Sequence, residues 1–327
     1  MNPEVARAPV PGSPRVVHSS GREGAAWVHV AEMRSDPDLL VEFVDAVDPR
    51  YPRDEKWVVI LSSQFGCPVA CAMCETGRWY RGNLTAEEML WQVDQVVLRR
   101  HPDRVVRSRK FKVQFARMGE PSLNPEVLRA LRLLRTRYEA PGLIACVTTT
   151  APRSRNTRAW FDALRLLKSE AYRGGAFQLQ FSINTTDESV RDRIMPVRKW
   201  SLAEVARYGE TFFEPGDRKV VLNFALAQGW PVEVDRVASI CDPSCFVIKL
   251  TPLNPTSRAQ ASGLRTVLAP GREQACEDLT AAFRANGFEV IISIGSEEEI
   301  AIRSNCGQAV RVGFASAEPS RNRSGPA

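Results

Sequence analysis

The sequence predicts an α/β fold, an open partial (β/α)6 barrel with a small β extension before it. From Trp57 onward, short runs rich in β-branched and aromatic residues alternate with longer helical stretches. This alternation is typical of repeated β-α units on a parallel sheet. The 327 residues and the hydrophobic fraction of 44% can supply a sizeable core. The units are too few for a closed eightfold barrel.

The sequence predicts seven strands from Trp57 onward. They cover residues 57–62, 111–116, 143–149, 177–183, 219–226, 246–251 and 288–294. A helix over 85–100 is expected to begin with a capping box formed by Thr85 and Glu88, and a helix over 124–137 repeats leucine at helical spacing. Residues 1–17 and 313–327 are expected to be disordered tails, which leaves a β extension over 18–50 and the barrel over 51–312.

Charge and hydropathy point to a soluble protein. The formal net charge of +6 is mild, so it permits an anionic partner without requiring one. The chain has no apolar run of membrane-spanning length, and its start is too weakly apolar for a signal peptide. We therefore expect a cytoplasmic location and no membrane partner.

Three cysteines, Cys67, Cys71 and Cys74, form a C-x3-C-x2-C triplet directly after the first expected strand. Three thiolates on one short loop can ligate three irons of a 4Fe-4S cluster and leave the fourth iron open. The residues between them are small or apolar, which suits a dry cluster site. This spacing resembles that of the radical S-adenosylmethionine (SAM) enzymes, in which SAM chelates the open iron.

Other uses of the cysteines fit less well. A zinc site needs a fourth Cys or His nearby, and none lies between Cys74 and His101. A disulfide framework suits a short secreted chain rather than one of 327 residues. Cys146 and Cys276 are expected to be small core residues. The pair Cys241 and Cys245 is weak evidence for a metal, and we assign it no role.

A second motif, Met118 to Pro121, follows the second expected strand, so it belongs to the same edge of the sheet. Gly119 allows a close backbone approach, and the Glu120 carboxylate suits an ammonium group. Hydroxyl and amide groups at later strand ends offer SAM contacts. They are Thr148, Thr149, Thr150, Ser182, Asn184 and Asn254. Taken singly, each would be interpreted as a turn or cap residue.

These motifs, in their order along the chain, resemble the RlmN/Cfr family of radical SAM RNA methyltransferases. The resemblance extends over about residues 18–310 and rests on the following segments: Ser62 to Cys67 with Cys71 and Cys74, Met118 to Pro121, Arg191 to Pro196, Asn254 with Pro255, and Cys306 to Gln308. It implies a 4Fe-4S cluster and SAM as cofactors and a protein electron donor of flavodoxin or ferredoxin type.

The resemblance also implies a two-stage reaction. One SAM methylates the thiol aligned with Cys306, and a second SAM is cleaved to a 5'-deoxyadenosyl radical that activates this methyl group. The methyl carbon then adds to carbon-2 or carbon-8 of adenine, an electron-poor sp2 carbon. Glu42 aligns with a glutamate thought to remove the substrate proton. The alternative for Cys306 is a buried or incidental thiol, but its loop after the last strand and the following Gly307 and Gln308 favour the carrier. From the residues alone, Glu42 could equally be a surface charge.

Two departures concern substrate handling. The position of the family's resolving cysteine holds Ile60, so release through a disulfide needs another thiol such as Cys146, or different chemistry. The family's helical RNA-binding domain, which precedes the β extension, has no counterpart in this sequence. The expected substrate is therefore either RNA or a nucleoside-like or phosphorylated small molecule.

Basic residues fall into two groups. The first, between residues 99 and 110, belongs to a loop at the amino edge of the sheet and is expected to be solvated. The second follows strand ends and is expected to ring the mouth of the barrel and meet phosphates. It consists of Arg153, Arg155, Arg158, Arg191, Arg193, Arg198 and Lys199.

The sequence thus favours a radical SAM C-methyltransferase that uses Cys306 as a methyl carrier. One alternative is a small-metabolite tailoring enzyme that keeps the radical step without methyl transfer. The other is a non-catalytic Fe-S protein for RNA binding or redox sensing, which would need no SAM pocket.

Overall fold

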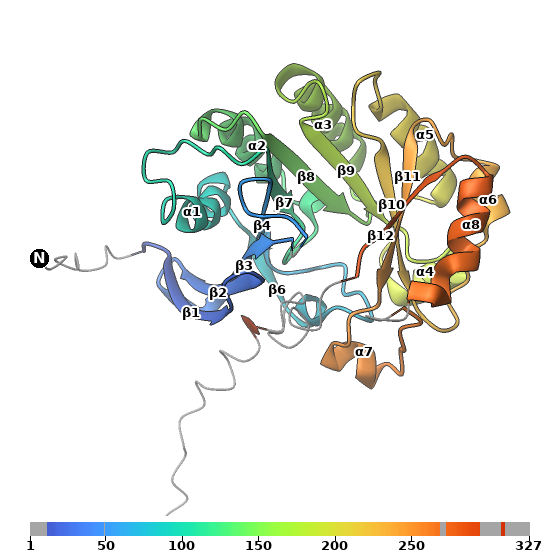
Figure 1. The fold of residues 1–327 in the computed structure, drawn as a ribbon. Helices are drawn as coiled ribbons and strands as arrows, with labels where there is room; N and C mark the ends of the chain where they lie inside the picture. The colour runs from blue at the N-terminus through green and yellow to red at the C-terminus, as the bar shows by residue number, and fades with distance from the viewer. Residues whose placement is uncertain (1–11, 49, 269–272, 295–308, 311–327) are drawn as a thin grey trace, which may run out of the picture.

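A ten-stranded sheet organises the chain in the computed structural model, which describes residues 12–48, 50–268, 273–294 and 309–310 (Figure 1). The strand order is β1-β2-β3-β4-β7-β8-β9-β10-β11-β12. The strands are β1 Arg15–Gly21, β2 Ala26–Met33, β3 Asp36–Val47, β4 Lys56–Leu61, β7 Lys110–Phe115, β8 Leu143–Thr149, β9 Phe177–Ser182, β10 Val220–Leu226, β11 Phe246–Pro252 and β12 Glu289–Ile292. A separate two-stranded sheet pairs β5 Gln64–Gly66 with β6 Tyr80–Asn83.

The seven strands from β4 to β12 in this sheet are parallel, and they coincide with the seven expected strands. The sheet is open, because β1 and β12 lie at its two edges rather than pairing with each other. The expected open α/β fold is therefore confirmed. The extension β1–β3 is an antiparallel meander, and β3 pairs directly with β4, so it continues the same sheet.

Helices surround this curved sheet, most of them on its outer face (Figure 1). They are α1 Ala86–Val97, α2 Glu126–Arg137, α3 Thr157–Ala171, α4 Glu188–Ile194, α5 Leu202–Phe212, α6 Val234–Ala238, α7 Ser257–Ala261 and α8 Glu277–Ala285, with 3-10 turns η1 Glu75–Arg78, η2 Pro121–Leu123 and η3 Glu273–Cys276. The capping box of Thr85 and Glu88 starts α1 as expected. None of the described helices has the length and apolar character needed to cross a membrane.

The two faces of the parallel strands differ in chemistry. In β4, Trp57, Val59 and Leu61 are fully buried under the helices, while the alternate residues Val58 and Ile60 are half-buried. The same alternation recurs in β7 and β9, whose inward residues include lysine and glutamine. The outer face thus supplies the hydrophobic core, and the concave face is a polar surface that can receive a ligand.

Candidate functional site

The cysteine loop leaves the carboxyl end of β4 through β5. Gly66 has a φ of +76°, and a Cβ there would lie 1.6 Å from the Trp79 carbonyl oxygen, so only glycine fits. The next residue, Cys67, closes the base of the loop by donating its N–H to the Thr76 and Trp79 carbonyls at 3.0 and 3.1 Å. The cysteine loop, residues 67–78, is therefore anchored to β5 at both of its ends.

The segment after β11 holds the middle of the cysteine loop. Thr256 Oγ1 donates to the Met73 carbonyl at 2.7 Å, and the Arg258 guanidinium donates to the Ala70 carbonyl at 3.0 Å. The backbone N–H of Arg258 also donates to Glu75 Oε1 at 2.7 Å. Sequence reasoning missed Thr256 and Arg258, because they lie more than 180 positions from their partners. Their only signal was the position directly after a strand end.

Apolar side chains surround the same loop. Val69 is buried in a cluster that includes Ile194, Met195 and Trp230, and Cys67 and Cys71 pack against this cluster. The Ala72 N–H donates to the Ile194 carbonyl at 2.8 Å, which ties the loop to α4. The loop is therefore shielded on one side by hydrocarbon, the setting in which an inorganic cluster is protected and tuned.

The three thiols are half-buried and close enough to affect each other's ionisation. Burial raises the pKa of the Cys67 and Cys71 thiols, and the charge of Cys74 raises both further. Among the described residues, no three His, Cys, Asp or Glu side chains converge on one metal ion. In a cubane each cysteine binds a different iron, so the three thiols of this loop could hold three irons of a cluster.

Glu120 lies beside this loop and joins two strand ends. Its carboxylate interacts electrostatically with Cys67 and Cys71. It accepts hydrogen bonds from the side chains of Ser122, Thr149 and Thr150 and from two backbone N–H groups. The structure thus brings together the cysteine triplet, the motif after β7 and the threonines after β8, which are far apart in sequence.

Gly119 is required by packing within the protein. Its φ is +107°, and a Cβ would lie 2.7 Å from Ser63 Oγ and 2.8 Å from Gln64 Cβ. The Glu120 N–H donates to Gln64 Oε1 at 2.8 Å, and Asn124 Nδ2 donates to the Ser63 carbonyl at 2.7 Å. The close approach expected at Gly119 therefore involves the link between β4 and β5.

The other expected SAM contacts occupy different environments. Thr148 and Ser182 are half-buried, and their alternation along β8 and β9 places them on the concave face. Asn184 has a φ of +67° and is buried, with its amide nitrogen 3.5 Å from Met195 Sδ. Asn254 is exposed in the turn after β11. Thr148 and Ser182 thus face the open interior, whereas Asn184 supports the backbone.

Glu42 is buried in β3 rather than exposed. Its Oε1 lies 2.8 Å from Arg117 Nε, and its Oε2 accepts from the N–H groups of Ala309 and Val310 at 3.1 and 3.3 Å. The surface-charge interpretation of Glu42 was wrong. Cys306 lies outside the described residues. Ala309 and Val310, three and four positions after it, donate their N–H groups to Glu42.

The sequence has relatives among RNA methyltransferases. It is 31% identical over 276 residues to the probable dual-specificity RNA methyltransferase RlmN of Frankia alni, covering 81% of this chain and 61% of the relative. It is 28% identical over 178 residues to the dual-specificity RNA methyltransferase RlmN of Helicobacter hepaticus, covering 54% and 45%. The chain belongs to the RlmN/Cfr-like family of radical SAM proteins. It spans about three fifths of the length of the Frankia alni relative.

A solved structure supports the fold of this RlmN-like chain. The crystal structure of a radical SAM methyltransferase from Sphaerobacter thermophilus matches with a TM-score of 0.68 at 21% identity, covering 90% of this chain and 81% of that one. At this identity the likeness establishes a common fold. No family model matches the chain.

Cys146 of the RlmN-like chain lies in an unexpected place. It is buried as predicted, with 3% of its surface exposed, but it belongs to the concave face rather than to the core under the helices. Strand pairing places Ile60 beside Gln114 and Gln114 beside Cys146, so the three share one row across β4, β7 and β8. Cys146 is the thiol named above as a substitute for the resolving cysteine, whose position holds Ile60. It is therefore two strands away from Ile60 on the same face.

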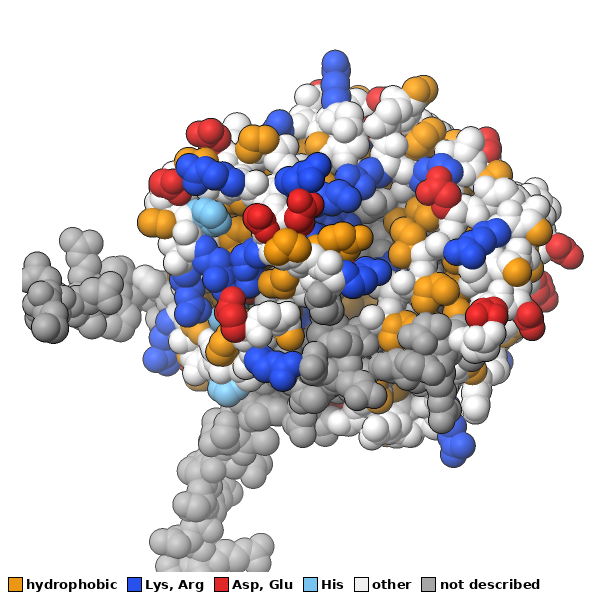
Figure 2. Space-filling view, viewed as in Figure 1, with side chains coloured by type: hydrophobic (Ala, Val, Ile, Leu, Met, Phe, Trp, Pro, Cys, Tyr) orange, Lys and Arg blue, Asp and Glu red, His pale blue; other side chains and the backbone are white. Residues whose placement is uncertain are grey.

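The basic residues follow the expectation only in part. Arg100, Arg104 and Arg109 in the amino-edge loop form ion pairs with Asp45, Asp94 and Glu55 respectively. Basic side chains spread widely over the left of the face in Figure 2. The expectation that Arg191 and Lys199 face the mouth was wrong, because both are buried and paired, with Glu188 and Asp192.

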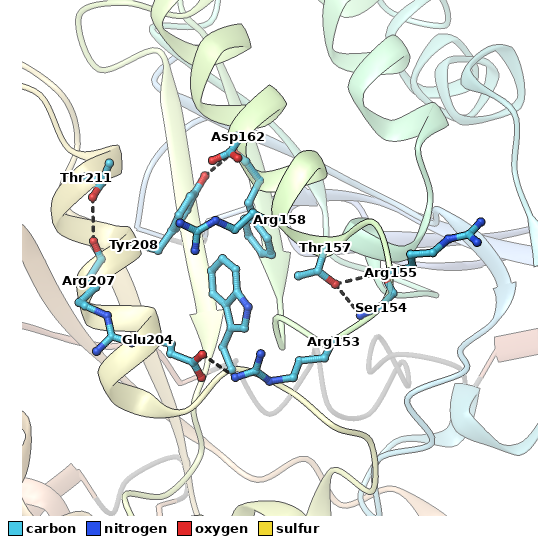
Figure 3. Close-up of a pocket in the computed structure, with 12 residues that line it drawn as sticks. Arg153, Ser154, Arg155, Thr157, Arg158, Asp162, Glu204, Arg207, Tyr208 and Thr211 are labelled. Atoms are coloured by element: carbon cyan, nitrogen blue, oxygen red, sulfur yellow. Dashed lines mark hydrogen bonds and ion pairs between the residues drawn. The ribbon is translucent and has the colours of Figure 1, made fainter.

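Three other arginines line a cleft between α3 and α5. This cleft of about 440 Å³ contains Arg155, Arg158 and Arg207, together with Trp200 and Tyr208 (Figure 3). None of the three arginines has an ion-pair partner among the described residues. Because α3 and α5 begin after the strand ends, the cleft opens near the same edge of the sheet as the cysteine loop.

Replacing Arg258 by Ala is expected to loosen the cysteine loop. Loss of the guanidinium leaves the Ala70 carbonyl without this donor and removes one of the bonds that tie α7 to the loop. We expect iron to be released to a chelator at least several-fold faster, as measured by absorbance after anaerobic reconstitution. Arg236→Ala, on the exposed side of α6, is the matched control. Equal release rates for the two variants would show that Arg258 has no part in holding the loop.

Proposed function

We propose that this chain is a radical SAM enzyme that binds a 4Fe-4S cluster through Cys67, Cys71 and Cys74 and transfers a methyl group to an sp2 carbon of an adenine-type substrate. The observation that supports it is the placement of three mutually interacting thiols and the Glu120 carboxylate at one edge of the sheet. When bound, the cluster supplies the electron that cleaves SAM.

Residues of the chain have three roles in this proposal. The apolar cluster around Val69 keeps water from one side of the cysteine loop. Glu120, fixed by the threonines after β8, orients the ammonium group of SAM. Thr148, Ser182, Asn184 and Asn254 line or support the remaining SAM site.

Cys306 is the proposed methyl carrier, and Glu42 is proposed to position its segment. Both Glu42 oxygens already have partners, Arg117 on one side and the backbone of 309–310 on the other. A general base needs an oxygen directed at the substrate proton. The contacts of Glu42 therefore favour anchoring over proton removal.

The proposed substrate is RNA, as the names of the relatives state for those proteins. The three arginines of the α3–α5 cleft, which form no ion pair with any described residue, offer contacts for phosphates near the mouth of the barrel. A cytoplasmic electron donor of flavodoxin or ferredoxin type completes the proposal. A nucleoside-like or phosphorylated small molecule is the alternative substrate, which the polar concave face would also accept.

Anaerobic reconstitution tests the proposal. We expect about four irons and four sulfides per chain, an EPR signal that changes on SAM addition, and 5'-deoxyadenosine after reduction. Mass spectrometry is expected to find a methyl group on Cys306. Cluster without 5'-deoxyadenosine would favour the non-catalytic Fe-S reading. Formation of 5'-deoxyadenosine with an unmodified Cys306 would favour the tailoring enzyme.

A further inference from the structure

Two lysines on the concave face of the sheet, Lys112 and Lys249, are close enough to interact electrostatically. Lys112 lies three residues before Phe115, the last residue of β7, and Lys249 lies three residues before Pro252, the last of β11. At roughly 3.3 Å per residue, both are about 10 Å of strand below the edge that carries the cysteine loop. Cys146, on the same face of β8, interacts electrostatically with both ammonium groups.

Neither ammonium group has a counterion among the residues that the structure describes. Lys112 and Lys249 form no hydrogen bond or ion pair within the part of the chain that the structure describes. Two other enclosed lysines are paired, Lys168 with Asp217 and Lys199 with Asp192, each at 2.6 Å. Burial lowers the pKa of both unpaired lysines, and the charge of Lys112 lowers that of Lys249 further.

This arrangement is unfavourable without an anion. A buried charge costs free energy unless it is paired, and two like charges that repel each other add to that cost. Both lysines remain half-buried rather than closed off, so a small ligand can reach them from the interior. Asn223, which pairs with Lys249 across β10 and β11, has a buried Oδ1 that accepts no hydrogen bond from the described part of the chain. An orphaned acceptor of this kind indicates a missing water or ligand atom.

We propose that the phosphate group of a small molecule binds between Lys112 and Lys249 on the concave face, with Asn223 Oδ1 accepting from a neighbouring ligand hydroxyl. The two ammonium charges match a phosphate monoester, which carries about −1.5 to −2 at pH 7. A carboxylate carries a single charge and would neutralise only one lysine. The site uses neither the cluster nor SAM, so it stands or falls separately from the proposed radical reaction.

Calorimetric titration of the full reconstituted chain with inorganic phosphate tests the site, with acetate as the carboxylate arm at constant ionic strength. We expect phosphate to bind, and Lys249→Met and Lys112→Met each to bind it at least about tenfold more weakly, because a charge-assisted contact is lost. Arg132→Met, which removes an exposed charge from α2, is expected to bind like the native chain. Acetate binding as tight as phosphate, or unchanged phosphate affinity in both lysine variants, would overturn the proposal.

Thermal unfolding gives an independent readout. In phosphate-free buffer we expect Lys249→Met to raise the unfolding midpoint by about 2 °C or more, because one of two repelling buried charges is removed. Phosphate is expected to raise the midpoint of the native chain and leave that of the variant unchanged. A lower midpoint for the variant in phosphate-free buffer, with the phosphate effect retained, would show that the lysines serve the fold alone.

Acetylation of lysines tests the site in the native chain, so the result does not depend on whether a variant folds. We expect phosphate to protect Lys112 and Lys249 from the reagent, while the exposed Lys110 on the same strand reacts equally with and without phosphate. Equal labelling of Lys112 and Lys249 in both conditions would overturn the site.

Discussion

Cys71→Ser is expected to abolish cluster binding, lowering the iron content from about four atoms per chain to near zero. The Cys71 thiol interacts electrostatically with both Cys67 and Cys74. A serine hydroxyl cannot replace it as a soft ligand for iron. Iron and sulfide analysis after anaerobic reconstitution, with the EPR spectrum, measures the effect. Formation of 5'-deoxyadenosine is expected to fall below detection.

Cys245→Ser is the matched control for this substitution. Cys245 is half-buried in the turn before β11, remote from the cysteine loop, and we assign it no role. We expect the control to retain the full iron content. If Cys71→Ser also retained it, the cluster would need a different ligand set and the proposed function would lose its main support.

Arg117→Met is expected to destabilise the protein by about 3–5 kcal/mol, because it leaves the Glu42 carboxylate buried without its cation. The two side chains are 4% and 0% exposed, so solvent cannot replace the lost partner. Denaturant unfolding measures the change. The double variant Glu42→Gln with Arg117→Met is expected to recover a large part of the loss, since it removes both charges.

Arg129→Met provides the comparison for an exposed pair. Its partner is Glu126, and the side chains are 60% and 37% exposed. We expect a loss below about 1 kcal/mol, in line with surface ion pairs. A similarly small effect for Arg117→Met would contradict the anchoring role of Glu42 and leave its function as a general base the stronger proposal.

The order of strands and helices followed from local sequence. Alternating burial in β4 and β7 and the capping box of α1 depend on residues within one element, and these periodicities can be recognised without knowing what each element packs against. The cysteine spacing was equally local. It identified the loop and its position after the first strand of the barrel.

Contacts between distant segments could not be foreseen in this way. The Arg258 bonds to the cysteine loop and the burial of Glu42 against Arg117 join residues that no short pattern links. Arg191 and Lys199 looked like exposed charges because a basic residue after a strand end usually is one. Only the packed structure showed that Arg191 and Lys199 are themselves buried and that each is paired with an acid.

The sequence by itself determined the parallel α/β fold and the loop that carries the cysteines, since periodicity and spacing are written within single elements. The tertiary structure decided which charges are buried and which are paired. It also brought Lys112 and Lys249 close enough to repel each other, with no counterion among the described residues. The physical reason is that side-chain electrostatics depends on neighbours brought together by folding, and strands far apart along the chain supply those neighbours.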